Sequence, residues 1–159
     1  MGAKKKTWQE KLADSNGHPT VLAITAKQSE RWGAGTCVIP APLEVDELMR
    51  RVPKGKLITI TELREVLARR HRATIACPVT TGIFAWIAAN AAGEAEAAGT
   101  PAPTPYWRTL KTGGELNPKY PGGIAGLKRR LSAEGHTVIQ KGKRFFVPDF
   151  RAHLAAIGR

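Results

Sequence analysis

The spacing of apolar residues predicts amphipathic helices in the middle of the chain. The first begins near Leu43 and carries Leu48, Met49 and Val52 on one stripe. It must end before Pro53, because proline disfavours helical geometry in the residue that precedes it.

A second helix begins at Thr59, which is followed three residues later by Glu62 in a capping-box pattern. Leu63, Val66 and Leu67 then fall on one stripe. Pro78 opens a third helix over residues 79–90, and we expect Ile83, Trp86 and Ile87 to form its buried face. The opposite face is predicted to be smooth because it carries small side chains, Thr80, Thr81, Gly82, Ala85 and Ala89. Two helices joined by a short turn indicate a helix-turn-helix.

A fourth stripe, Ile124, Leu127 and Leu131, predicts a helix that Gly135 terminates. Residues 137–140 and 144–147 then flank a Lys-Gly-Lys turn, the pattern of a β-hairpin with a positively charged tip. The predicted fold is therefore mainly α with a small β-hairpin, a winged helix-turn-helix domain.

We expect that domain to occupy residues 43–159, preceded by an irregular basic N-terminal arm over residues 1–42 that Trp8 and Trp32 hold against it. Residues 91–103, rich in Ala, Gly, Glu and Pro, are predicted to be an insertion loop or a frayed continuation of the preceding helix.

The charge points to a polyanionic partner. Among 159 residues, 25 Lys and Arg oppose 13 Asp and Glu, a formal net charge of +12. Residues 108–144 hold nine basic and two acidic side chains, more than half of this surplus. Such local charge favours phosphate binding that weakens with salt, by releasing condensed counterions. The expected partner is double-stranded DNA, with RNA left open.

Other classes of function find little support in the sequence. It contains no apolar run long enough for a bilayer and no secretory signal, so we expect no membrane and a cytoplasmic, nucleoid-associated location. Two cysteines and four scattered histidines show no metal-ligand spacing, and we expect reduced thiols, no metal and no cofactor. The expected state is a monomer.

Five segments between residues 43 and 136 together resemble one family in order and spacing. They are Val52-Pro53-Lys54-Gly55-Lys56, residues 58–67, Pro105-Tyr106-Trp107-Arg108-Thr109, Tyr120-Pro121-Gly122-Gly123 and Leu131-Ser132-Ala133-Glu134-Gly135-His136. The family is that of the methylated-DNA-protein cysteine methyltransferases and their alkyltransferase-like relatives. The resemblance implies a DNA-binding domain that takes a base out of the duplex.

Carried across by motif, the family's acceptor cysteine falls on Tyr106 and its activating histidine on Trp107, while Glu134 matches its glutamate and Arg108 its motif arginine. A phenol is a poor nucleophile at neutral pH, so alkyl transfer at Tyr106 is not expected. Alkyltransferase-like proteins also lack the cysteine and bind damaged bases. The family's intercalating arginine falls near Thr81, and the tyrosine that rotates the phosphate falls on Ile60.

The resulting hypothesis is a DNA-repair protein that recognises alkylated or otherwise modified bases without transferring the alkyl group. Its lesion pocket would comprise Tyr106, Trp107, Arg108, Tyr120 and Glu134. Its DNA contacts would come from the third helix, from the fourth helix and from the hairpin, at Thr80, Thr81, Gly82, Asn90, Lys128, Arg129, Arg130, Lys141 and Lys143.

Two alternatives stay open. An active alkyltransferase could use Cys77 as its acceptor, because a thiol just before a helix can have a lowered pKa. We favour a packing role for Cys77, as no His or Lys is adjacent in sequence. A plain winged-helix DNA-binding protein without lesion specificity is the second alternative.

Overall fold

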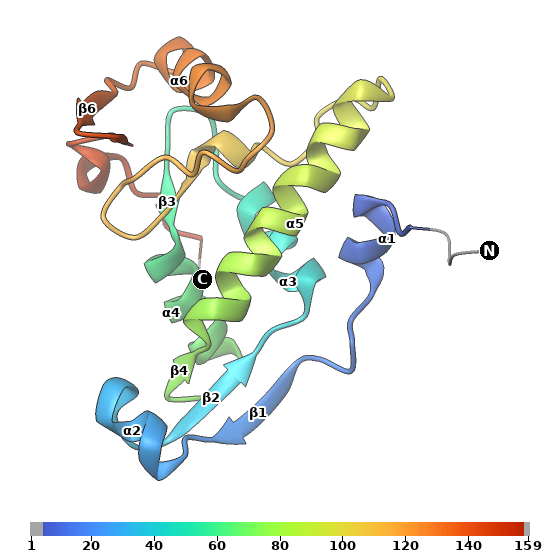
Figure 1. The fold of residues 1–159 in the computed structure, drawn as a ribbon, viewed down its shortest axis with the longest axis vertical. Helices are drawn as coiled ribbons and strands as arrows, with labels where there is room; N and C mark the ends of the chain where they lie inside the picture. Colours follow the sequence, from blue (N-terminus) through green and yellow to red (C-terminus); the bar gives the residue numbers. More distant parts are fainter. Residues whose placement is uncertain (1–4, 158–159) are drawn as a thin grey trace.

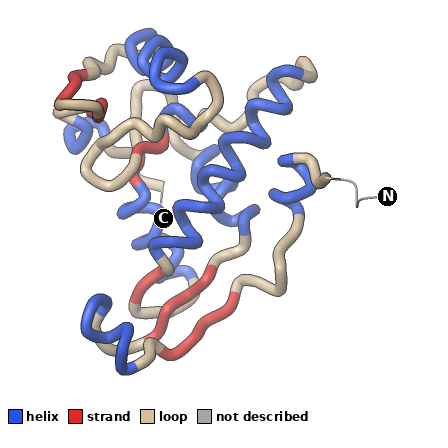
Figure 2. Tube along the Cα trace, in the orientation of Figure 1, coloured by secondary structure: helices blue, strands red, loops and turns tan. Residues whose placement is uncertain are grey.

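The computed structural model describes residues 5–157, which form a mainly helical protein with three small sheets (Figures 1 and 2). The helices within this range are α1 (Trp8–Ala13), α2 (Ala26–Trp32), α3 (Pro42–Arg50), α4 (Ile60–Arg70), α5 (Pro78–Ala97) and α6 (Gly123–Ala133), with 3-10 turns η1 (Tyr106–Arg108) and η2 (Phe150–His153). The strands are β1 (Thr20–Ala23), β2 (Thr36–Ile39), β3 (Ile58–Thr59), β4 (Ile75–Ala76), β5 (Thr109–Leu110), β6 (Ile139–Lys141) and β7 (Arg144–Phe146).

The predicted mainly helical fold with a small hairpin is confirmed. The predicted capping box begins α4: the Thr59 hydroxyl accepts from the Thr61 amide, and the Glu62 carboxylate accepts from the Thr59 amide at 2.9 Å. A short connection that contains β4 joins α4 to α5, and β6 pairs with β7 after α6. This order is consistent with a helix-turn-helix followed by a wing.

The core gathers the stripes that the sequence predicts. Leu48 and Met49 of α3, Leu63 and Leu67 of α4, and Leu131 of α6 are fully buried. Burial of such side chains stabilises the fold by roughly 1.5–3 kcal/mol each. No helix within residues 5–157 combines the length and the apolar character needed to cross a membrane.

The N-terminal segment is not the irregular arm that we expected. It contains α1, α2 and two strands, and β2 lies between antiparallel β1 and parallel β4 in one sheet. Val38 of β2 is completely buried. The glycines and prolines of this segment favour turns, and Gly17, Pro19, Gly33, Gly35 and Pro40 lie between these elements, whereas Pro42 begins α3. Residues 1–4 of the predicted arm lie outside the described residues.

Residues 91–97, predicted to be an insertion loop or a frayed continuation of the preceding helix, form the last, well-packed part of α5. Ala91 and Ala92 are buried, because this part of α5 packs against α1 (Figure 1). The carboxylate of Glu94 accepts the backbone amides of Trp8 and Gln9 at 3.0 Å each, at the amino end of α1. A carboxylate in this position stabilises the unpaired amides of a helix start. The alanines of this segment therefore belong to a packed helix and not to a solvent-facing loop.

The face of α5 that turns inward is also different from the prediction. The small-residue face is buried, with Thr81, Ala85, Ala88 and Ala89 all fully enclosed. Ile83, predicted to be buried, is 44% exposed. Small side chains allow the backbone of α5 to lie close to α3, and this close packing outweighs the burial of one isoleucine.

Candidate nucleic-acid interface

A groove with a volume of ≈ 730 Å³ lies between the first half of α5, the start of α4 and the loop after β5. Its α5 wall consists of Val79, Gly82, Ile83 and Trp86, which recur at helical spacing on one face. Tyr120 and Pro118 of the loop also line the groove. The volume is within the range of small-ligand sites in proteins.

Basic side chains surround the groove and come from outside α5. They are Arg64 on α4, Lys111 and Lys119 on the loop and Arg144 on β7, with Glu115 as their acidic neighbour. Residues 78–93 of α5 contain no charged side chain. The groove therefore has an uncharged wall with cations at its margin.

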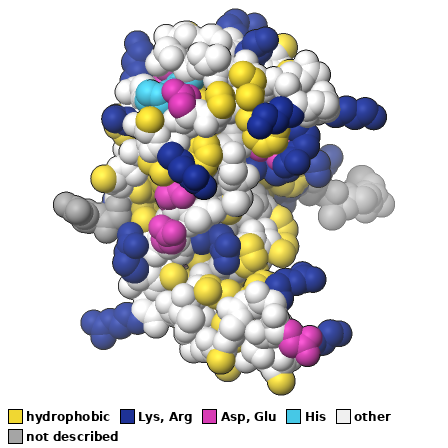
Figure 3. Space-filling model, turned by 90° about the vertical axis from the view of Figure 1, so that its left-hand side faces the viewer, with side chains coloured by type: hydrophobic (Ala, Val, Ile, Leu, Met, Phe, Trp, Pro, Cys, Tyr) yellow, Lys and Arg dark blue, Asp and Glu magenta, His cyan; other side chains and the backbone are white. Residues whose placement is uncertain are grey.

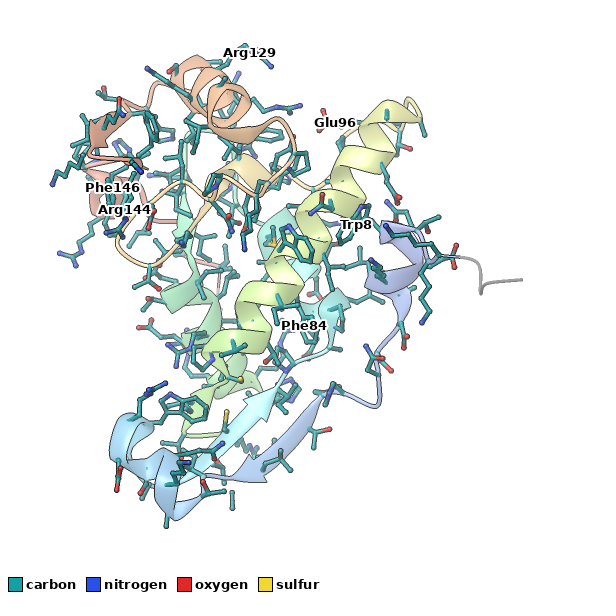
Figure 4. All side chains as sticks on the ribbon, viewed as in Figure 1. Trp8, Phe84, Glu96, Arg129, Arg144 and Phe146 are labelled. Atoms are coloured by element: carbon teal, nitrogen blue, oxygen red, sulfur yellow. The ribbon has the colours of Figure 1, made fainter. Side chains whose placement is uncertain are left out.

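Glu115 holds two of these cations in place. Its carboxylate accepts from Arg144 Nη2 at 2.8 Å and Nε at 3.1 Å, and Lys111 Nζ lies 3.7 Å from Oε1. The hydrogen bond from Arg144 lowers the pKa of the Glu115 carboxyl, which stays ionised at neutral pH. Figure 4 shows Arg144 beside the loop that carries these groups.

Backbone hydrogen bonds fix this loop to the wing. The Leu116 amide donates to the Phe145 carbonyl, and the Val147 amide donates to the Gly114 carbonyl. Gly114 has a φ of +85°, and a Cβ there would lie 2.4 Å from Phe150. Only glycine fits this close approach, so the position of Lys111 and Glu115 depends on it.

Trp86 is held by residues far away in the sequence. Its ring lies edge-on to Trp8 at 4.8 Å between centroids, and its Nε1 donates to the Lys119 carbonyl at 3.3 Å. The N-terminal helix thus supports the aromatic part of the groove. Asn90, one turn further along α5, donates through Nδ2 to the Trp86 carbonyl at 2.9 Å.

The five predicted lesion-pocket residues lie together next to the groove. Tyr106 is edge-on to Trp107 at 5.4 Å and to Tyr120 at 6.2 Å between centroids. The Glu134 carboxylate accepts from Trp107 Nε1 at 2.9 Å and from Arg108 Nη2 at 2.8 Å. We call Tyr106, Trp107, Arg108 and Glu134 the aromatic cluster.

The aromatic cluster is largely buried, although Trp107 and Arg108 are partly exposed and line a small pocket of their own. Tyr106 is only 3% exposed, and the guanidinium of Arg130 lies 4.4 Å from the Trp107 ring centroid and 5.4 Å from that of Tyr106. Arg130 in turn bonds to Glu96 at 2.6 Å. Figure 4 places Glu96 near the C-terminal end of α5. Tyr120 is also buried but lines the groove.

The electrostatics of the cluster suit a structural role. Burial raises the pKa of the Tyr106 phenol, so it stays neutral at physiological pH. Burial also favours a higher pKa for Glu134, but hydrogen bonds from Arg108, Trp107 and the Gly55 amide outweigh it and lower that pKa. Arg108 Nη1 also donates to the Val52 carbonyl at 2.8 Å. The carboxylate thus ties η1 to the end of α6 and to the segment before β3.

Comparison with known proteins shows no family and gives a likeness to a solved structure. No family model matches this chain, and no curated protein sequence matches it. Among solved structures it is similar to S. pombe Atl1, which was crystallised in complex with damaged DNA containing O6-carboxymethylguanine. The identity is 19%, the match covers 72% of this chain and 94% of the other, and the TM-score is 0.45.

The predicted DNA-contacting residues of α5 lie in different environments. Thr81 is fully buried and its hydroxyl donates to the Cys77 carbonyl at 2.7 Å, so the prediction that it contacts DNA is wrong. A threonine that bonds back to its own helix cannot also reach outward. Thr80 is half-buried and is not part of the groove wall, whereas Gly82 is.

None of the predicted basic residues lines the groove, and Arg130 packs on the Trp107 ring and bonds to Glu96. Lys128 and Arg129 are exposed on α6, and Lys141 and Lys143 are exposed on the wing. Figure 4 shows Arg129 at the top of the molecule and Arg144 on its left side. Figure 3 shows Lys and Arg side chains distributed over much of that side, with apolar patches between them.

The groove residues that the sequence prediction left out are its exposed apolar pair and its nearest cations, Val79, Ile83, Arg64, Lys111, Lys119 and Arg144. Three of these cations belong to the basic excess over residues 108–144. Because they are far from α5 in the sequence, no local pattern predicts that they lie beside it. Within residues 5–157, no group of three or more His, Cys, Asp or Glu is placed to hold a metal ion.

Cys77 is close to a second thiol. It is half-buried at the start of α5, and its amide donates to the Val38 carbonyl at 2.9 Å. Burial raises the pKa of the neighbouring Cys37 thiol, and the nearby Cys77 adds to this effect. Among the described residues that line the groove there is no cysteine.

Proposed function

We propose that this protein binds double-stranded DNA through the groove and holds a modified or distorted base there, as an alkyltransferase-like protein of DNA repair. The observation that carries the proposal is the combination of an uncharged, partly aromatic groove wall with cations at the margin. Cations that contact phosphates position a protein on a duplex, and groups at the base edges or faces supply discrimination. The groove contains both.

Tyr120 is the member of the predicted pocket that would contact the base. It lines the groove together with Trp86. Aromatic side chains accept an unstacked base with little regard to its identity, which suits recognition of several lesions. Tyr106, Trp107, Arg108 and Glu134 would then position Tyr120 from behind. Lys128, Arg129, Lys141 and Lys143 would contact phosphates further along the duplex.

We propose that binding proceeds without alkyl transfer. The Tyr106 hydroxyl is buried with a raised pKa, so it offers no phenolate. The Glu134 carboxylate, which matches the family's glutamate, is occupied by Arg108 and Trp107. Recognition that ends in binding would need other repair proteins to remove the lesion.

The test compares two duplexes that differ only in one O6-methylguanine, by fluorescence anisotropy over a series of salt concentrations. We expect tighter binding of the modified duplex and a steep loss of affinity with salt. Arg144→Ala should reduce the salt slope by about one unit. Lys27→Ala is the matched control, because Lys27 is exposed on α2 outside the groove.

Three outcomes would change the proposal. Equal affinity for both duplexes would favour the plain winged-helix binder. A covalent mass gain after exposure to alkylated DNA, lost in Cys77→Ser, would establish the alkyltransferase. Tighter binding to an RNA duplex of the same sequence would move the partner from DNA to RNA.

A further inference from the structure

The two cysteines of the chain lie far apart in the sequence and close together in the fold. Cys37 belongs to β2, and Cys77 directly follows β4, which pairs with β2 in parallel. Figure 1 shows β2 and β4 side by side next to the start of α5. The sequence contains no other cysteine, and neither of the two lines the groove. The proposed DNA binding therefore gives these thiols no role.

The register of the sheet places both thiols on the same face. Cys37 is paired with Ile75, so Cys77, two residues further along, is the diagonal neighbour of Cys37. The Cys77 amide donates to the Val38 carbonyl at 2.9 Å, which continues the ladder beyond the last residue of β4. Neighbouring strands lie about 4.8 Å apart, so side chains at such positions can reach each other.

The two thiols differ in their access to solvent. Cys37 is only 7% exposed, whereas Cys77 is half-buried. Burial raises the pKa of the Cys37 thiol, the interacting Cys77 thiol raises it further, and the Arg64 guanidinium acts in the opposite direction. An oxidant from solvent therefore meets Cys77 first, with Cys37 beside it on the inner side. An accessible thiol next to a second thiol that can displace the oxidant is the arrangement of redox-responsive cysteine pairs.

Cys77 lies at the junction where β4 ends and α5 begins. Its carbonyl accepts from the Thr81 amide at 3.1 Å and from the Thr81 hydroxyl at 2.7 Å. The other end of the β2–β4 pair is fixed by Thr36 and Thr74, each of which accepts the amide of the other through its hydroxyl, at 3.1 and 3.0 Å. A bond between the two sulfurs would fix the end of the pair from which α5 starts.

We propose that Cys37 and Cys77 form a reversible disulfide when the protein meets a small-molecule disulfide, and that this bond fastens β2 to the start of α5. The Cys77 thiolate attacks one sulfur of the small disulfide, whose S–S bond breaks and releases one thiolate. The Cys37 thiolate then attacks the Cys77 sulfur of the mixed disulfide and releases the second thiolate. Both protein thiols are oxidised, the small disulfide is reduced to two thiols, and the two protons pass to the released thiolates.

The experiment follows the thiols of the folded protein, with oxidised glutathione as the probe. After incubation at mildly alkaline pH, the protein is unfolded in the presence of N-ethylmaleimide and weighed by mass spectrometry. We expect the wild type to lose about two mass units and to take up no maleimide, because each thiol has lost its hydrogen to the exchange. Treatment with dithiothreitol before labelling should restore both labels.

The two single variants are matched controls for each other. Cys37→Ser keeps the accessible thiol without its neighbour, so its reaction should stop at a mixed disulfide that carries one glutathione. Cys77→Ser keeps only the buried thiol and should react at least about ten times more slowly. Cys37→Ala repeats the first control with an apolar side chain at the buried position. A cooperative urea transition shows that each variant is folded.

Urea unfolding of the oxidised wild type tests whether the bond fastens the junction. A cross-link that closes a loop of about 40 residues restricts the unfolded chain, so the urea midpoint should rise on oxidation and return with dithiothreitol. An intramolecular disulfide with this rise, absent from both single variants, would support the proposal. A lasting mixed disulfide in the wild type, a disulfide between two molecules, two free thiols after oxidation, or an unchanged midpoint would overturn it. None of these results bears on DNA binding.

Discussion

The groove and the aromatic cluster lie side by side but differ in almost every physical respect. The cluster is largely buried, its Arg108 is paired with Glu134, and the adjacent Arg130 is paired with Glu96. The groove keeps Ile83 exposed and Arg144 63% exposed at its side chain. A region whose polar groups are already paired contributes to stability, whereas exposed apolar and basic groups are available to a partner. Variants in the two regions should therefore fail in different ways.

The largest contrast is expected between Tyr106→Ala and Ile83→Ala. Tyr106→Ala opens a cavity in the core and should reduce the free energy of unfolding by about 3–5 kcal/mol. Ile83→Ala removes a half-exposed side chain and should cost less than about 1 kcal/mol. Urea unfolding measures both. Similar losses for the two variants would remove the distinction between the regions.

A second contrast concerns the two carboxylates. Glu134→Gln takes the charge from a buried hydrogen-bonded ion pair and should lower the unfolding free energy by about 2 kcal/mol. Glu115→Gln should cost under about 1 kcal/mol, because its partners Arg144 and Lys111 are largely solvated. Thermal unfolding at constant salt checks the order. A greater loss at Glu115 would make the groove margin a structural feature.

Gly82→Ala separates stability from binding within the groove itself. The added methyl meets no atom within 4 Å, and alanine is favoured over glycine inside a helix, so stability should rise by roughly 0.5–1 kcal/mol. The same methyl would occupy open space at the groove wall and should weaken binding of the modified duplex. A variant that is more stable and binds as well as the wild type would show that this open space has no role in binding.

The smallest effect is a pH dependence at His136. Burial lowers the pKa of its imidazole, with His153 adding to the effect, so the unfolded chain binds the proton more readily. Its contribution to stability is complete above the unfolded pKa near 6.5 and is lost as pH falls through the lower folded value. Urea unfolding of wild type and His136→Gln over this window should show a steeper acid loss in wild type.

The sequence was informative where one physical effect dominated. Capping at Thr59 and the stripe of Leu63 and Leu67 predict α4, because a helix start and an apolar face need only local residues. The resemblance to the alkyltransferase family correctly groups Tyr106, Trp107, Arg108, Tyr120 and Glu134 in space. Whether they recognise a lesion stays a prediction.

The sequence was misleading where two packing solutions competed. In α5, hydrophobicity favours burial of Ile83, whereas close approach to α3 favours burial of Ala85 and Ala89, and the second prevails. In residues 20–39, the turn-rich composition hides a sheet whose partner strand, β4, lies far along the chain. Pairing between distant segments leaves no local pattern to read.

The contact between Trp8 and Trp86 joins α1 to the groove, although no residue of α1 lines the groove. The amino end of α1 also bonds to the Glu94 carboxylate, so α1 is attached to α5 by an aromatic contact and by hydrogen bonds to a helix end. A chain without α1 would keep every residue that lines the groove, but its Trp86 ring would no longer be held by Trp8. Binding in the groove would thus depend on a segment that lies outside it.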